Sequence, residues 1–288
     1  MLGQDLIDAL KAHELSGVGL GEGRDLGIPY ETADLSDQAL VDPCWDKVRP
    51  ELVFHLAALT NVDLCETERD LACRANTKAV ACVAQASKRH GAPVVFFSTD
   101  FVFDGLEARE YTETDTPNPL SYYGTTKRDA ETVLKTCGGP FVIFRICWLY
   151  GARGRSFPAS ILAQAEKGAP LKVVSDQIGR PTYTRDVCNA LSQLLSADEN
   201  VFQRYAGETF HLANDGTASW ADFADETLRL AGYPIQVERI TAAQLNRPAR
   251  RPAHAVLSLD KTQTILGVRL RPWQLALKDF IRERQNIG

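Results

Sequence analysis

Two segments that are apolar almost throughout most restrict how this chain can fold. They are Val94-Val95-Phe96-Phe97 and the run from Phe141 to Trp148. Such runs are typical of parallel strands, which helices cover on both faces. Residues 121–137 lie between them, favour a helix and end at Gly138-Gly139-Pro140, which breaks it. Strand, helix and strand joined by short links predict a parallel sheet with right-handed crossovers.

The first half of the chain continues this alternation. Apolar residues have helical spacing over 2–10, and a strand-like run at 16–21 is followed by an apolar strand at 52–54 and an Ala-rich helix over 71–90. We therefore predict a doubly wound, Rossmann-type α/β fold, with residues 1–150 as the dinucleotide-binding domain. Residues 151–288 are expected to form mainly a smaller substrate-binding region, some segments of which can return to the Rossmann sheet. Its predicted helices cover residues 157–167, 184–196, 219–231 and 272–284.

The start of the predicted Rossmann unit departs from the usual pattern. Such a fold normally opens with a strand, a glycine-rich turn and a helix N-terminus that receives the pyrophosphate of the cofactor. Here Met1-Leu2-Gly3 corresponds to the end of that turn. We expect the first strand and the first two glycines to lie upstream of Met1, and the 288-residue chain to bind NADPH weakly. A coding sequence that begins further upstream is the favoured interpretation, and a truly shortened protein is the alternative.

Composition excludes several other classes. The net charge of −5 and the absence of a Lys/Arg block give no reason to expect a nucleic-acid partner. No apolar stretch approaches the roughly 18 residues that span a membrane, and the N-terminus is not a secretory signal, so we expect a cytoplasmic protein. The seven cysteines lack Cys-x-x-Cys spacing and are expected to be buried free thiols. The histidines are scattered, so no metal site is predicted.

The strongest chemical signal is Tyr123-Gly124-Thr125-Thr126-Lys127. A tyrosine and a lysine four residues apart share one face of a helix. Ketone reduction needs a proton on the oxygen as hydride reaches the carbon, and a phenol with a pKa of about 10 is a poor acid–base group at neutral pH. A nearby ammonium would lower that pKa and could also hydrogen-bond the nicotinamide ribose. Taken alone, the motif fits equally well an exposed helical pair without a role.

Two strand ends give this motif a context. Ser98 and Thr99 follow the run that ends at Phe97, and ligands bind beyond the carboxyl ends of parallel strands in this fold. Thr99 is predicted to hydrogen-bond a substrate carbonyl and align it with Tyr123, with turn capping as the alternative. The small residues of Leu56-Ala57-Ala58-Leu59-Thr60 would let a flat cofactor approach the backbone, unless they form only an ordinary tight connection.

Together these motifs resemble the extended short-chain dehydrogenase/reductases, and within them the family of dTDP-4-dehydrorhamnose reductases. The resemblance covers nearly the whole chain. It implies NAD(P)H-dependent reduction of the 4-keto group of a deoxy-sugar nucleotide, from dTDP-4-dehydrorhamnose to dTDP-rhamnose, for cell-surface polysaccharide precursors. It also implies NADP as the cofactor, with NAD as an alternative, and a homodimer. The runs that carry it are 55–63, 98–105, 118–127, 145–151, 176–182 and 251–253.

The resemblance also implies residue roles. The catalytic residues would be Thr99, Tyr123 and Lys127. The cofactor would contact Tyr123 and Lys127 as well as Gly3, Asp34, Leu35, Ala57, Ala58, Thr60 and Asn76. The sugar nucleotide would contact Thr99, Asp100, Phe101, Trp148, Gly179, Thr182 and Arg251.

Other activities of this fold stay open. Sugar-nucleotide 4,6-dehydratases carry a glutamate where this chain has Phe101, which cannot act as an acid or base, so dehydration is disfavoured. A nucleotide-sugar epimerase shares the tyrosine and lysine but recycles its cofactor. A non-catalytic regulatory subunit would not need Thr99, Tyr123 and Lys127 together. The turn at 21–24 offers both Glu22, suited to a ribose hydroxyl, and Arg24, suited to a 2′-phosphate, and so leaves the choice between NAD and NADP open.

Overall fold

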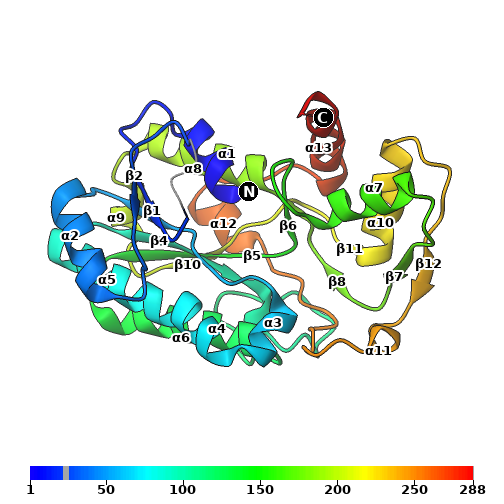
Figure 1. Cartoon of the computed structure of the whole chain (residues 1–288), viewed down its shortest axis with the longest axis horizontal. Coiled ribbons are helices and arrows are strands. Elements are labelled where there is room, and N and C mark those ends of the chain that lie inside the picture. The colour runs from blue at the N-terminus through cyan, green and yellow to red at the C-terminus, as the bar shows by residue number, and fades with distance from the viewer. Residues whose placement is uncertain (22–25, 288) are drawn as a thin grey trace.

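A parallel four-stranded sheet forms the centre of the molecule (Figure 1). In the computed structural model, residues 1–21 and 26–287 are described. Both long strands are buried at every position, as their apolar composition predicts. All three pairings are parallel, so the predicted α/β fold is confirmed. The strand order is β10 (Thr209–His211), β5 (Phe141–Ile146), β4 (Val94–Thr99), β3 (Val53–His55).

Helices cover both faces of this sheet (Figure 1). On one face, α2 (Gln38–Val48), α5 (Ala79–His90) and α6 (Tyr122–Cys137) pack on alternate residues of β4 and β5, including Phe96 and Ile143. On the other face, α1 (Leu2–Ala9) and α8 (Thr184–Ala197) pack on the intervening residues. This alternation follows from the two-residue repeat of a strand whose two faces are both buried.

The Ala-rich helix expected over 71–90 is interrupted by one wider turn. It consists of α4 (Arg69–Cys73), a π-helical turn (Arg74–Lys78) and α5, and it follows α3 (Val62–Thr67). Such π-helical turns are rare and are frequent at functional sites. This one buries the side chain of Asn76, which is 1% exposed.

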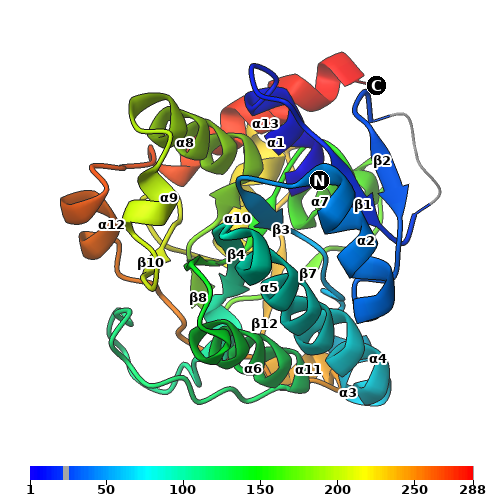
Figure 2. The same cartoon turned by 90° about the vertical axis from the view of Figure 1, so that its left-hand side faces the viewer.

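Two further strands form a separate pair. β1 (Gly17–Gly19) and β2 (Tyr30–Thr32) are parallel to each other and lie to one side of β3 (Figure 2). Within residues 1–21 and 26–287, β1 pairs only with β2, and β3 pairs only with β4. A cavity of about 1880 Å³ is lined by residues of both β1 and β3.

A second region begins where β5 ends. Its core includes Tyr150, Phe223, Trp273 and Phe280. Ser219 and Asp222 form a reciprocal capping box at the start of α10. Two of its segments belong to the Rossmann unit, since α8 packs on α1 and β10 extends the sheet beside β5. Its elements are β6 (Leu149–Tyr150), α7 (Phe157–Glu166), β7 (Lys172–Val174), β8 (Ile178–Gly179), β9 (Thr182–Tyr183), α9 (Val201–Arg204), β11 (Ala218–Ser219), α10 (Trp220–Leu230), β12 (Glu238–Ile240), α11 (Ala242–Leu245), α12 (Asp260–Ile265) and α13 (Trp273–Ile287).

The cysteines are free thiols, as expected, although not all are buried. Cys65, Cys82, Cys147 and Cys188 are buried, whereas Cys73 is exposed, so the expectation of burial is wrong there. Within the described ranges, no group of three or more His, Cys, Asp or Glu side chains could hold a metal ion. The same ranges contain no helix that is both long and apolar enough to cross a membrane.

Candidate active site

The three predicted catalytic residues meet at the carboxyl end of β4. Thr99 is the last residue of β4, and Tyr123 and Lys127 lie in the first two turns of α6. The Thr99 hydroxyl donates to the Asp100 carboxylate at 3.0 Å, accepts the Phe101 N–H at 3.2 Å and interacts with the Tyr123 phenol. The Lys127 Nζ donates to the Phe97 carbonyl oxygen at 2.7 Å. The strand end and the helix thus bring a hydroxyl, a phenol and an amine to one place.

A glycine allows α6 to approach this strand end so closely. A Cβ on Gly124 would lie 2.2 Å from the Phe101 carbonyl oxygen, a distance that no side chain tolerates. Ser121 begins the helix, and its hydroxyl accepts the Gly124 N–H at 3.2 Å. The ring of Phe101 meets the ring of Tyr123 edge-to-face, with centroids 5.7 Å apart. The backbone after Thr99 therefore packs directly against the first turn of α6.

The surroundings keep Tyr123 protonated. Burial raises the pKa of Tyr123 well above its usual value, and Asp100 raises it further. The hydrogen bond from Thr99 lowers this pKa by a smaller amount. The expected contribution of Lys127 does not appear, because its amine is turned toward the Phe97 carbonyl and the Phe96 ring. Tyr123 therefore carries its proton at neutral pH.

Lys127 itself titrates near neutrality. Its side chain is 3% exposed, and burial lowers the pKa of Lys127 to about 7, an effect that Glu131 partly opposes. The Nζ lies 3.9 Å from the centroid of the Phe96 ring. Charged and neutral forms are consequently both populated around pH 7.

A buried ion pair between Glu131 and Arg145, one helical turn beyond Lys127, was not predicted from the sequence. Glu131 accepts the Arg145 Nη2 at 2.7 Å and the Arg145 Nε at 3.0 Å, and it accepts the Ser98 hydroxyl at 2.5 Å. Burial opposes ionisation of Glu131, but the bonds from Arg145 and Ser98 outweigh it and hold its pKa below the usual value. Two signals were available: Glu131 follows Lys127 by four residues, and Arg145 interrupts an apolar strand.

Asp100 and Phe101 form the turn that follows Thr99. Asp100 is 2% exposed, and one carboxylate oxygen accepts the Thr99 hydroxyl at 3.0 Å. Its Oδ2 has no hydrogen-bond partner within the described residues. Burial raises the pKa of Asp100 to about 7. Phe101 is half-buried against Tyr123, so both predicted substrate residues lie beside the phenol.

The predicted cofactor loop follows β3. Ala57 and Thr60 are exposed and Ala58 is half-buried, which leaves a small-residue surface at this strand end. Asn76 clamps the loop: its Oδ1 accepts the Leu59 N–H at 2.7 Å, and its Nδ2 donates to the Leu59 carbonyl at 3.1 Å. The same Nδ2 donates to the Thr126 hydroxyl at 3.0 Å. Asn76 thus positions the loop against α6 and offers no free amide to a cofactor.

The remaining predicted cofactor residues lie on neighbouring elements. Gly3 lies in α1, and a Cβ there would be 3.3 Å from Leu56. Asp34 accepts the Ser36 N–H at 2.9 Å and its hydroxyl at 2.8 Å, and these bonds lower the pKa of Asp34. Gly3, Leu35 and Ala57 line the 1880 Å³ cavity, whereas Thr99, Tyr123 and Lys127 do not. Glu22 and Arg24 lie outside the described residues.

These residues fit a dinucleotide. An ionised Asp34 can accept ribose hydroxyls, and the small residues after β3 can admit a flat ring. Lys127, buried between Phe96 and the end of β4, can donate to a second ribose. The donors and acceptors at the strand ends therefore match ribose hydroxyls of a nicotinamide dinucleotide.

The predicted substrate residues Trp148, Gly179 and Thr182 form one cluster. Trp148 has a left-handed backbone, with φ of 48°, and its ring stacks on Trp220 with centroids 3.6 Å apart. A Cβ on Gly179 would lie 2.5 Å from the Trp148 ring, so this position requires glycine. Thr182 is fully buried, and its N–H donates to the Trp148 carbonyl at 3.1 Å. Thr182 therefore holds the Trp148 backbone in place and does not face solvent.

Arg251 joins this region to the loop after β3. Its Nη2 donates to the Asp63 carboxylate at 2.9 Å, and its Nη1 donates to the Ala249 carbonyl at 3.0 Å. Asp63 lies in the first turn of α3. The predicted sugar-nucleotide residue thus reaches the neighbourhood of the predicted cofactor loop, already paired with a carboxylate.

Known proteins are similar to this chain in both sequence and architecture. A family model described as the RmlD substrate binding domain matches residues 1–286. A dTDP-4-dehydrorhamnose reductase from Aggregatibacter actinomycetemcomitans is 34% identical over 267 residues, which are 88% of each chain. A solved dTDP-4-dehydrorhamnose reductase from Clostridium acetobutylicum is similar with a TM-score of 0.84 at 31% identity, over 94% of this chain and 100% of that one. The one from Bacillus anthracis, solved with NADP, has a TM-score of 0.82 at 27% identity over the same shares. The chain therefore belongs to the RmlD substrate binding domain family.

Proposed function

We propose that this protein uses NADPH to reduce the 4-keto group of a deoxy-sugar nucleotide, converting dTDP-4-dehydrorhamnose to dTDP-rhamnose. The chain is an oxidoreductase of its family, and NADP is its cofactor. One observation carries the proposal: Thr99, Tyr123 and Lys127 converge at the carboxyl end of β4. The similarity to reductases that act on dTDP-4-dehydrorhamnose supports the choice of substrate.

The residues of the site suit the proton side of this reaction. NADPH, when bound, supplies the hydride that carbon 4 receives. Tyr123 holds a proton at neutral pH and donates it from Oη to the carbonyl oxygen, while the Thr99 hydroxyl hydrogen-bonds that oxygen and fixes its position. For the phenolate that remains to be stabilised, the charged amine of Lys127, one turn further on the same face of α6, turns from the Phe97 carbonyl toward Oη. Solvent then returns the proton to Tyr123.

Turnover with a defined substrate tests the proposal. Purified protein given a dTDP-4-keto-6-deoxy sugar and NADPH should form one 4-hydroxy product for each NADPH oxidised. An isomerised product without NADPH consumption would instead identify an epimerase. Cofactor binding without any turnover would identify a non-catalytic member of the family. The Tyr123→Phe variant, checked for an unchanged thermal melt, serves as the inactive control.

The cellular setting follows from the same proposal. We infer that the product enters cell-surface polysaccharide synthesis and that the protein acts in the cytoplasm as a homodimer. Fractionation of cells and analytical ultracentrifugation of the purified protein test the location and the assembly. A monomer at micromolar concentration would contradict the inferred dimer and leave the proposed reaction untouched.

A further inference from the structure

Two neighbouring hydrogen bonds join α6 to the end of β4. The Lys127 Nζ donates to the Phe97 carbonyl oxygen at 2.7 Å. The hydroxyl of the next residue, Ser98, donates to the Glu131 carboxylate at 2.5 Å. Lys127 and Glu131 are four residues apart and therefore share one face of the helix. The carboxylate thus lies at the same contact between helix and strand as the amine.

Glu131 keeps a negative charge although it is buried. Without a partner, a carboxylate in such surroundings would take up a proton. Arg145 lies opposite Ser98 in the register of β5 and β4, and it donates to Glu131 at 2.7 Å and 3.0 Å. These bonds hold the pKa of Glu131 below its usual value, so the carboxylate is ionised at neutral pH. A fixed negative charge is therefore present on the buried face of α6.

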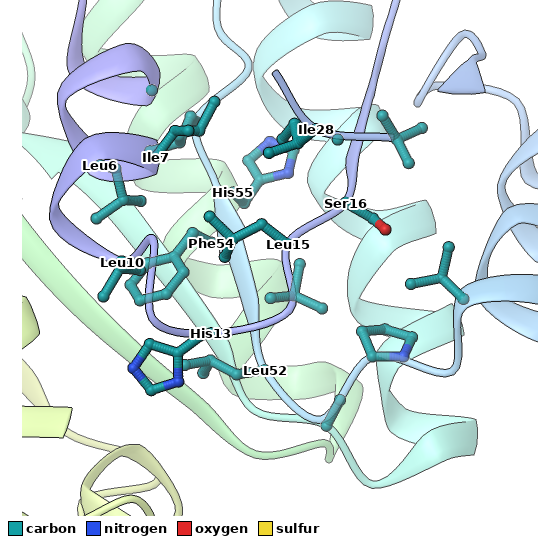
Figure 3. Close-up of a pocket in the computed structure, with 18 of the residues that line it drawn as sticks. Leu6, Ile7, Leu10, His13, Leu15, Ser16, Ile28, Leu52, Phe54 and His55 are labelled. Atoms are coloured by element: carbon teal, nitrogen blue, oxygen red, sulfur yellow. The ribbon is translucent and has the colours of Figure 1, made fainter. Parts of the chain in front are cut away.

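Two titratable groups of the described chain face the Lys127 amine. Glu131, on the same helix, favours the charged form of the amine. His55 comes from β3 and lines the 1880 Å³ cavity (Figure 3), and burial lowers the pKa of His55 to about 3, so this ring is neutral at pH 7. From β4 the amine meets the Phe96 ring and the Phe97 carbonyl, neither of which titrates. The negative charge that offsets burial of the amine therefore comes from Glu131.

We propose that Glu131 is a positioning residue for the reduction, and that its charge keeps the buried Lys127 amine in the ammonium form. Only an ammonium can stabilise the phenolate that Tyr123 becomes after it donates its proton. Glu131 lies two helical turns from Tyr123 and acts through Lys127. The consequence for turnover rests on the proposed function, whereas the effect on the charge of Lys127 does not.

A titration of Lys127 in the full chain, without cofactor or substrate, tests the proposal. Its side-chain Cε resonance is identified by its absence from the Lys127→Met spectrum and is followed by NMR between pH 5 and pH 10. Glu131→Gln keeps the shape of the side chain and removes its charge. The titration midpoint of Lys127 should then fall by about one pH unit or more, as expected when a nearby opposite charge is lost. Glu131→Asp restores a carboxylate and should return the midpoint most of the way.

Two further variants separate the charge from the packing. Ser98→Ala removes one hydrogen bond to Glu131 but leaves its charge paired with Arg145, so the Lys127 midpoint should not move. Glu131→Met combined with Arg145→Met removes both charges and leaves neither unpaired, so it replaces Glu131→Gln if that variant does not fold. In the double variant the midpoint should fall as well. An equal fall in Ser98→Ala would overturn the assignment to charge.

The pH profile of kcat extends the test to the reaction. The ammonium is lost as pH rises through its pKa, so the limb where kcat falls with rising pH should move to lower pH in Glu131→Gln. Asp100 titrates over the same range in both proteins, so the difference between their profiles reports Lys127. A lowered midpoint without turnover, even in the wild type, would contradict the proposed function and support the role of Glu131. An unchanged midpoint in Glu131→Gln and in the double variant would overturn that role.

Discussion

At Tyr123 the protein favours the neutral phenol over the phenolate. Burial and Asp100 both raise its pKa, and the Thr99 hydroxyl offsets only part of that shift. A protonated phenol can give a proton to a ketone, whereas oxidation of an alcohol needs a base. The environment of this one residue therefore favours reduction over oxidation at neutral pH.

Removal of the phenol hydroxyl tests this role. Tyr123→Phe should lower kcat by about 10²–10⁴-fold, the range typical of a lost general acid, with little change in the KM of the sugar nucleotide. Steady-state kinetics with NADPH absorbance provide the measurement. Tyr122→Phe, on the adjacent residue of α6, is the matched control and should retain activity. Normal turnover by Tyr123→Phe would remove this residue from the mechanism.

Burial of Lys127 lowers the free energy of unfolding, and the size of this effect depends on pH. An unfolded lysine has a pKa of about 10.4, whereas burial lowers the pKa of Lys127 to about 7. Between these values the unfolded chain binds a proton that the folded chain does not. The contribution of Lys127 to the free energy of unfolding therefore rises as pH increases from 7 to 10. Below pH 7 the destabilisation by Lys127 has its full value.

Lys127→Met should thus stabilise the protein, relative to the wild type, more at pH 6 than at pH 9. Urea unfolding at both pH values measures the difference, while kcat should fall because the positive charge is lost. Lys135→Met changes a far more exposed lysine of the same helix and should give a nearly constant difference. A Lys127→Met effect that is equal at both pH values would mean that the amine is not perturbed by burial.

Among the helices, α6 carries most of the polar side chains of the predicted active site. Tyr123, Lys127 and Glu131 recur every four residues and so lie on one face of this helix. The sequence predicts its bounds closely, because Ser121 caps the start and Gly138, with φ of 77°, ends it. The π-helical turn at Arg74–Lys78 could not be predicted, because the Ala-rich composition of 71–90 is that of an uninterrupted helix.

The wide turn has a functional consequence through Asn76. Asn76→Ala would leave the Leu59 N–H unpaired, and the Leu59 carbonyl would keep only the Cys65 thiol as a donor, at a cost of about 1–3 kcal/mol if the loop stays buried. The loop with Ala57 and Ala58 should loosen, so we expect the KM of NADPH to rise about tenfold while kcat changes less, since about 1.4 kcal/mol corresponds to a factor of ten.

Thr77→Val provides the matched control for this variant. The Thr77 hydroxyl bonds to the Thr126 carbonyl at 2.9 Å, so it ties the same turn to α6 without touching the loop. Its loss should cost stability but leave the KM of NADPH unchanged. A normal KM in Asn76→Ala would mean that the loop holds its shape without the clamp.

For the whole molecule, the pair of Glu131 and Arg145 joins the helical layer to the sheet. Both side chains are about 1% exposed, and one comes from α6 and the other from β5. The sequence predicts Thr99, Tyr123 and Lys127 as catalytic residues because short motifs carry them. Sequence reasoning missed this pair because 14 positions and a change of element separate the partners. The three-residue strand β10 was missed as well, because it depends on pairing with β5 more than on its own composition.

Breaking this pair should destabilise the whole fold. Arg145→Met leaves a buried carboxylate without its partner and should cost about 3–5 kcal/mol, measured by urea unfolding. The double variant Glu131→Met with Arg145→Met removes both charges and should lose much less. If the two losses simply add when the single changes are combined, the pair is not a coupled unit.

The stacked indoles of Trp148 and Trp220 give the protein an optical signature. At 3.6 Å between centroids and 10° between planes, two chromophores share their electronic excitation. Trp148 directly follows β5 and Cys147, whereas Trp220 opens α10 in the second region. Their exciton couplet in circular dichroism therefore reports the position of the second region relative to the sheet. A ligand that separates the two rings, or that moves Trp148 out of its left-handed conformation, should abolish this couplet. The change can be measured on the unlabelled protein.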